Sequence, residues 1–251
     1  MLVIVMNIDR HIARMNANGS TVGESLGNST KNSINYLFKD SPFYRIIKIE
    51  NEDVEVRISE RAGLTNIKSS QYKSLTFRPN SKFNLGDIAE FDDEEWMIID
   101  FTDNDIFPLA SIQRVNEQLR WLDREGNLAT TPCIVNKSPL DRIFVKDNRY
   151  DVPVVDQMMY VLIKYDDMSR LIVNGQRFIL GSQAYLVNGI DDLSYVHKDR
   201  GVVQLILSFS NKKNKDDMVN KIADNSHLYE IKEPNDPNNP INPPDDGGDW
   251  W

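Results

Sequence analysis

Cysteine, histidine and long hydrophobic runs are scarce in this sequence of 251 residues. Cys133 is the single cysteine, which excludes a disulfide framework and a thiolate zinc site and favours a reducing compartment. The apolar residues 1–5 have no basic stretch before them and are followed at once by Asn7, Asp9 and Arg10, so they do not form a signal peptide. No stretch approaches the roughly 18 apolar residues that a membrane helix needs, and we expect no membrane partner.

Sequence motifs of catalytic and cofactor sites are missing too. The three histidines, His11, His197 and His227, fall in different segments, and none has a ligand at metal-binding spacing. The chain contains no G-x-S-x-G, no G-x-x-x-x-G-K-[ST] and no G-x-G-x-x-G. Since no nucleophile, base and orienting group can be assembled, we predict a protein that is not an enzyme and that holds no cofactor or metal.

The acidic residues and the cysteine receive structural interpretations. Asp103 and Asp105 resemble the start of a calcium loop, but Pro108 stands where the loop needs glycine, so we interpret the segment as a turn. Cys133 lies in an apolar run, which favours an inert buried thiol over a nucleophile. Three acid pairs are interpreted as solvated loops: Asp92–Asp93, Asp191–Asp192 and Asp216–Asp217.

Residues 233–251 form a tail of unusual composition. They hold five of the eleven prolines, and Ile241 is the single apolar residue before the terminal Trp250 and Trp251. Five acids and no base give the tail −5 of the net charge of −9, which leaves −4 for residues 1–232. A segment of prolines and acidic residues has too little apolar surface to compensate for the conformational entropy that its backbone would lose on folding. We therefore predict a disordered acidic tail. A mildly acidic body also argues against general nucleic-acid binding.

Trp250 and Trp251 are the candidate partner-binding residues of the chain. Two exposed tryptophans lower solubility, and tryptophan is enriched among residues that anchor protein interfaces. The arm can thus carry an aromatic anchor to a partner or a neighbouring subunit. The alternative is a solvated tail with no task, which is common at chain termini.

Helical spacing is confined mainly to the start of the chain. Residues 1–42 are predicted as an N-terminal helical segment, with apolar positions on one face of residues 8–15 and again of residues 31–39. Ser29 or Thr30 is the predicted N-cap of the second helix, and Pro42 ends it. A short closing helix is expected within residues 216–224.

From residue 43 onward, the sequence is dominated by alternating apolar and polar residues, separated by residues that favour turns. We predict a mainly β fold of two small barrel- or sandwich-like units, at 43–136 and 141–225, with the break between Asn136 and Asp141. The expected strands lie at 45–49, 54–58, 88–91, 96–101, 117–122, 133–135, 142–145, 158–165, 177–180, 184–187 and 202–209.

Aromatic side chains on the strands admit two interpretations. As core or barrel-seam residues they would be buried, and we predict this for Trp96 and Trp121 in particular. As a stacking platform they would make the protein an OB-type single-stranded nucleic-acid-binding protein with an acidic protein-recruiting tail, which is the alternative function. The aromatic residues concerned are Phe83, Phe91, Trp96, Phe101 and Trp121.

Three groups of segments resemble virion structural proteins of tailed phages of Gram-positive hosts, encoded near the portal and head–tail connector genes. They are residues 9–16 with 30–35 and 40–45; residues 85–91 with 95–99, 113–123 and 131–135; and residues 175–180 with 184–191 and 201–207. The resemblance covers roughly residues 5–210, rests on strand patterns and turn residues, and does not include the tail.

The resemblance implies a non-enzymatic subunit of the head–tail connector, similar to a stopper, adaptor or collar protein. Such a subunit forms a homo-oligomeric ring between portal and tail in the virion, assembled in the host cytoplasm. Its implied partners are copies of itself, the portal or neighbouring connector and tail proteins, and double-stranded DNA in transit. An acidic channel wall would repel phosphate and let the DNA slide.

Overall fold

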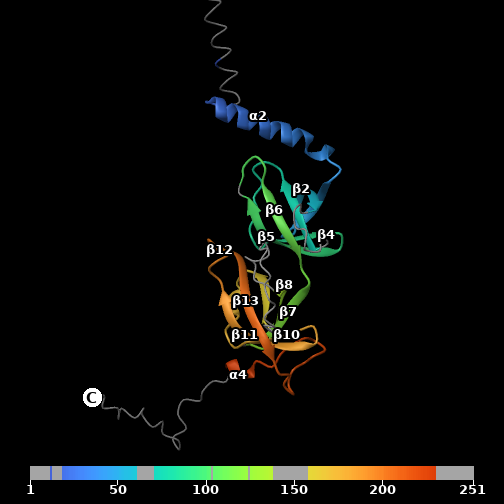
Figure 1. The fold of residues 1–251 in the computed structure, drawn as a ribbon, viewed down its shortest axis with the longest axis vertical. Coiled ribbons are helices and arrows are strands. Elements are labelled where there is room, and N and C mark those ends of the chain that lie inside the picture. Colours follow the sequence, from blue (N-terminus) through green and yellow to red (C-terminus); the bar gives the residue numbers. More distant parts are fainter. Residues whose placement is uncertain are drawn as a thin grey trace, which may run out of the picture.

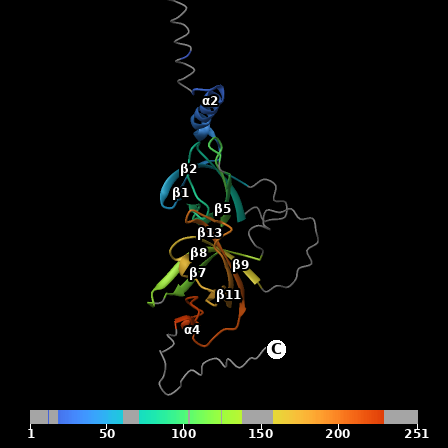
Figure 2. The ribbon, with the colours of Figure 1, turned by 90° about the vertical axis from the view of Figure 1, so that its left-hand side faces the viewer.

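The computed structural model describes Ile12 and residues 19–60, 71–102, 104–123, 125–137 and 158–229. In this part of the chain, α2 lies at one end and the short helix α4 (Ser226–Tyr229) at the other, with two β-sheets between them (Figures 1 and 2). The predicted mainly β fold class, with two barrel-like sheets and a short N-terminal helix, is confirmed.

Helix α2 (Val22–Leu37) begins earlier than the sequence pattern predicted. The Thr21 hydroxyl accepts a hydrogen bond from the Glu24 amide at 3.2 Å, and the Glu24 carboxylate accepts one from the Thr21 amide at 3.3 Å. This capping box fixes the start, and the predicted N-cap at Ser29 or Thr30 is wrong. The 3₁₀ helix η1 (Phe38–Asp40) continues α2 and ends before Pro42, as predicted.

The first sheet is a closed antiparallel barrel with the strand order β1-β2-β3-β6-β5-β4. The predicted β1–β2 hairpin is confirmed, with Ile47 opposite Val54. Strands β3 and β6 were not predicted. Trp96 is fully buried in the barrel core, as expected. The strands are β1 (Tyr44–Ile49), β2 (Glu52–Glu60), β3 (Tyr72–Phe77), β4 (Ile88–Phe91), β5 (Glu94–Thr102) and β6 (Leu109–Arg114).

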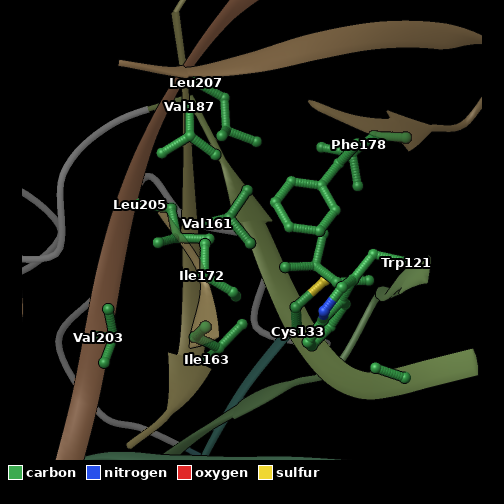
Figure 3. Packing of buried hydrophobic residues seen from close by; sticks show 13 residues of the cluster. Trp121, Cys133, Val161, Ile163, Ile172, Phe178, Val187, Val203, Leu205 and Leu207 are labelled. Carbon is green, nitrogen blue, oxygen red and sulfur yellow. The ribbon is translucent and has the colours of Figure 1, made fainter. Parts of the chain in front are cut away.

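The second sheet has the order β10-β11-β13-β9-β8-β7, and the short β12 pairs with β13. It curls so that its outer strands meet: the Trp121 ring on β7 packs edge-on against Phe178 on β10, with centroids 5.8 Å apart (Figure 3). The strands are β7 (Glu117–Leu122), β8 (Leu128–Asn136), β9 (Met158–Lys164), β10 (Arg177–Leu180), β11 (Gln183–Asp191), β12 (Val196–His197) and β13 (Arg200–Ser210), and the 3₁₀ helix η3 is Ser169–Leu171.

The division between the two sheets falls between Arg114 and Glu117, whereas the sequence pattern placed the break between Asn136 and Asp141. Strands β7 and β8 leave the barrel because β8 pairs with β9, a partner from beyond residue 157. The two sheets share an apolar cluster, to which the barrel contributes Met97 and the second sheet Leu162. They are therefore packed directly on each other.

Residues 211–225 close the far end of the second sheet without a helix, so the predicted closing helix is wrong. An ion pair takes its place: Arg177 donates to both carboxylate oxygens of Asp216, at 2.7 and 2.9 Å. Both side chains are buried, so the expectation of a solvated Asp216–Asp217 loop is wrong for Asp216. Its oxygens also accept the amides of Lys213 and Asp224, which folds the segment around one carboxylate.

Candidate interaction surface

Helix α2 is a highly exposed element of the described chain. None of its residues is buried, and Val22, Leu26 and Tyr36 are 68%, 64% and 84% exposed. In Figure 1 it lies across the end of the barrel that is farthest from the second sheet. A helix of this kind in a globular protein normally buries its apolar side chains, so the exposed face is a candidate contact for another molecule.

Two arginines of the barrel bind the C-terminal end of α2. The Arg57 guanidinium donates to the carbonyls of Leu37, at 2.6 Å, and Phe38, at 3.0 Å. Arg78 donates to the carbonyl of Asn35 at 2.9 Å. The last carbonyls of a helix lack partners within it and carry partial negative charge, so two cations there stabilise both the helix and its position.

Phe38 lies between the same two arginines. The Arg57 and Arg78 guanidinium carbons are 4.6 and 4.7 Å from its ring centroid, and Tyr44 meets it edge-on at 6.3 Å. Phe38 is fully buried. Because cation–π contacts strengthen when they are desolvated, this ring fixes the end of α2 to the barrel wall.

Glu55 holds the cationic groups of this contact together. Its carboxylate accepts hydrogen bonds from Tyr44 at 3.0 Å and from Arg78, and it pairs with Lys39 at 2.8 Å. The hydrogen bond from Lys39 is the largest cause that lowers the pKa of Glu55 to about 2; burial opposes the shift, and Arg78 and Tyr44 add to it. Glu55 therefore stays charged under ordinary conditions. We call Phe38, Glu55, Arg57 and Arg78 the helix latch.

The helix latch fixes one end of α2 and leaves the other end projecting. Along the helix, Lys31 donates to the Asn80 side chain at 2.9 Å, whereas Val22 and Leu26 nearer its start are largely exposed. Val22 and Leu26 are thus presented on a well-positioned helix. The arrangement suits binding to a protein surface.

The described residues include only some of the residues that the sequence analysis singled out. Trp250, Trp251, His11 and Asp103 lie outside the described residues. His197 is exposed in β12, and the Nε2 atom of His227 is 3.0 Å from the Gly175 carbonyl. Within the described ranges, no three His, Cys, Asp or Glu side chains are grouped to hold a metal, and no helix is long and apolar enough to cross a membrane.

The remaining candidates are mostly structural. Cys133 is buried, as predicted, and burial raises the pKa of its thiol, which favours a structural role over a nucleophilic one. Trp121 is buried, as expected, and Phe83 and Phe91 pack against the barrel core. Phe101 is 41% exposed, which leaves one of the five aromatic residues on the surface rather than a row of them.

The acidic loops have local tasks. Asp92 and Asp93 form the turn between β4 and β5 with φ of 53° and 59°. The Asp191 side chain accepts the amides of Leu193 and Ser194.

Residues 117–208 match the family model of the YomX C-terminal domain, a phage-type family. The match begins with β7 and ends within β13, so it covers nearly all of the second sheet and none of the barrel. It starts at the sheet division that the structure shows, not at the predicted break after Asn136. No curated protein and no solved structure matches the chain. The chain is thus similar, over its second sheet, to a phage-type domain.

Proposed function

We propose that this protein is a non-enzymatic virion structural protein of a tailed phage. Within that class we propose a head–tail connector subunit, of stopper, adaptor or collar type, that forms a ring between portal and tail. The match of residues 117–208 to a phage-type domain is the observation that carries the phage assignment. The connector role rests on the resemblance described above.

The exposed helix supports a role in assembly. A subunit of a ring must present a defined surface to its neighbour, and α2 is held by the helix latch with its apolar side chains in solvent. We propose that Val22 and Leu26 contact a neighbouring subunit or the portal. Exposed apolar side chains gathered on one element commonly mark such a contact.

The test compares incorporation into particles. The variant Val22→Asn/Leu26→Asn changes two exposed residues of α2, and Leu193→Asn/Val219→Asn changes two exposed apolar residues in loops. Both proteins should fold like the parent. We expect the α2 variant to be lost from purified virions, measured by quantitative mass spectrometry, while the loop variant is retained. A parent protein that is absent from virions would refute the proposal.

A further inference from the structure

A hollow at the junction of the two sheets differs from the other hollows in its chemistry. It is lined by apolar and aromatic side chains, among them Leu85, Phe101 and Val196, and by the basic residues Lys198 and Arg200. No carboxylate lines it. Three other hollows in the described part of the chain each include at least four carboxylates. This hollow is therefore suited to an aromatic group that carries negative charge.

The cations of this hollow have no carboxylate partner among the described ion pairs. Arg200 donates to the neutral Asn84 side chain at 3.0 Å, and Lys198 stands in the turn between β12 and β13. In contrast, Arg170 nearby pairs with Asp199 at 3.2 Å. The positive charge of Lys198 is thus available to an acidic ligand, and Arg200, which also lines the neighbouring hollow that contains Asp199, adds to it.

The chain itself ends in a segment with the matching chemistry. Residues 245–251 read DDGGDWW: three aspartates, two glycines and two tryptophans. The indoles match the apolar wall, and the aspartates match Lys198 and Arg200. We propose that residues 245–251 of the same chain bind in this hollow, with Trp250 or Trp251 against Phe101.

The length of the arm permits this contact within one molecule. The hollow lies at the start of β13. At the other end of β13, the Ser210 hydroxyl is 3.4 Å from Nε of Arg177. The Arg177 amide in turn donates to the Asn225 side chain, which places the end of the described chain near this end of the strand. The described chain ends at Tyr229, near the Ser210 end of β13. To reach the hollow, the arm must therefore cover the length of β13, which is about 36 Å for its eleven residues. The twenty residues between Tyr229 and Trp250 span about 60 Å when extended.

Tethering favours the chain's own arm over that of a second copy. A linker that spans its site gives an effective concentration in the millimolar range, which exceeds the concentration of a second subunit in dilute solution. The contact would bury the two tryptophans in the isolated subunit. This inference concerns the free subunit and does not depend on the proposed place in the virion.

Hydrogen exchange of the full chain tests the proposal. We expect residues 194–201 to be protected in the parent, and to lose that protection after truncation beyond Lys232 and in Trp250→Ser/Trp251→Ser. Lys198→Glu should reduce it, while Lys212→Glu, with the same charge change in another exposed loop, should not. Acrylamide quenching of Trp250 and Trp251 should rise in Lys198→Glu.

Two results would overturn the proposal. Equal exchange of residues 194–201 with and without the arm would mean that the hollow is empty of it. Protection that disappears on dilution, together with a dimer mass, would mean that the arm binds a second copy and not its own chain.

Discussion

A Cβ atom placed on Gly86 would lie 2.2 Å from the carbonyl oxygen of Gly201, so the barrel and the second sheet touch through their backbones at this point. Gly86 has a φ of +88°, and its amide donates to the Ile98 carbonyl at 2.8 Å. The Gly201 carbonyl accepts the Tyr165 amide at 2.9 Å. Neither side of the contact can retreat without losing a backbone hydrogen bond.

Gly86→Ala should therefore destabilise the protein strongly. Gly126 supplies a matched control, because its φ of +85° is nearly the same and nothing lies within 4 Å of a Cβ there. We expect Gly126→Ala to lower the free energy of unfolding by about 1–2 kcal/mol through backbone strain alone. Gly86→Ala should cost about 3 kcal/mol or more, measured by urea denaturation. Equal losses would show that the two sheets can separate without cost.

The buried Arg177–Asp216 pair makes stability depend on pH. Burial raises the pKa of Asp216, but the hydrogen bonds from Arg177 and from backbone amides outweigh it and lower the pKa to about 2. The ordinary aspartate value is about 3.9. Because the folded pKa is the lower one, this stabilisation is present above that ordinary value and is lost as the pH falls toward 2.

Asp216→Asn should cost about 3–5 kcal/mol at neutral pH, because it leaves the Arg177 charge buried without a partner. The variant should also lose part of the acid dependence of unfolding. Asp192→Asn, at an exposed position, is the control and should leave the parent's curve unchanged. Urea denaturation at neutral and acidic pH measures both effects.

The strand pattern and the aromatic core could be read from the sequence because they depend on local alternation. Residues 54–58 alternate strictly and lie within β2, and Trp96 and Trp121 stand in apolar runs. Strand β3 was missed because its apolar positions are Tyr72, Leu75 and Phe77, which do not alternate strictly.

The sheet division and the helix latch depend on contacts between distant residues. Strand β8 pairs with β9 across a long connection, and no local pattern tells that it leaves the barrel. Arg57 and Arg78 lie 20 and 43 residues from the carbonyls that they bind. Nothing in the sequence around Arg57 or Arg78 distinguishes them from arginines that lie on the surface without such contacts.

The helix latch should depend on the charge of Glu55. Glu55→Gln removes the anion that joins Lys39, Tyr44 and Arg78, and we expect faster hydrogen exchange in residues 35–40 with little change in the melting temperature. Acidification toward pH 2 should likewise speed hydrogen exchange in residues 35–40, because Glu55, whose folded pKa is about 2, becomes protonated there and loses its negative charge. Glu52→Gln, exposed on the same strand, serves as the control and should not alter exchange there.

Trp96 and Trp121 should be required for stability. Each is almost completely buried, in the barrel and in the second sheet respectively. Replacing either by alanine should lower the free energy of unfolding by about 3–5 kcal/mol through loss of apolar contact and formation of a cavity. Leu128→Ala, at a residue that is 57% exposed, should change little. Unchanged melting temperatures in the two tryptophan variants would contradict the core that Figure 3 shows around Trp121.

The acidic arm should be dispensable for folding of the isolated subunit. Residues 233–251 contain five prolines and five acids, and such a composition cannot form a core. Truncation after Lys232 should leave a protein that still folds cooperatively, because the apolar clusters of both sheets lie within residues 47–207. Its unfolding midpoint should fall only by the stabilisation that the bound arm adds. A truncated protein that fails to fold would show that the arm belongs to the core.

The same arm should be needed for a contact in the assembled particle. Trp250 and Trp251 combine large apolar area with a polar N–H, which is the chemistry of interface anchors. Once they leave their own subunit, the seventeen residues before them reach about 50 Å when extended, enough to cross a neighbouring subunit. We expect the truncated protein and Trp250→Ala/Trp251→Ala to fold and yet to be depleted from particles, whereas Ile241→Ala, which leaves the indoles in place, is retained. If both arm variants assemble like the parent, the arm is a solvated tail and the anchor role of the tryptophans is wrong.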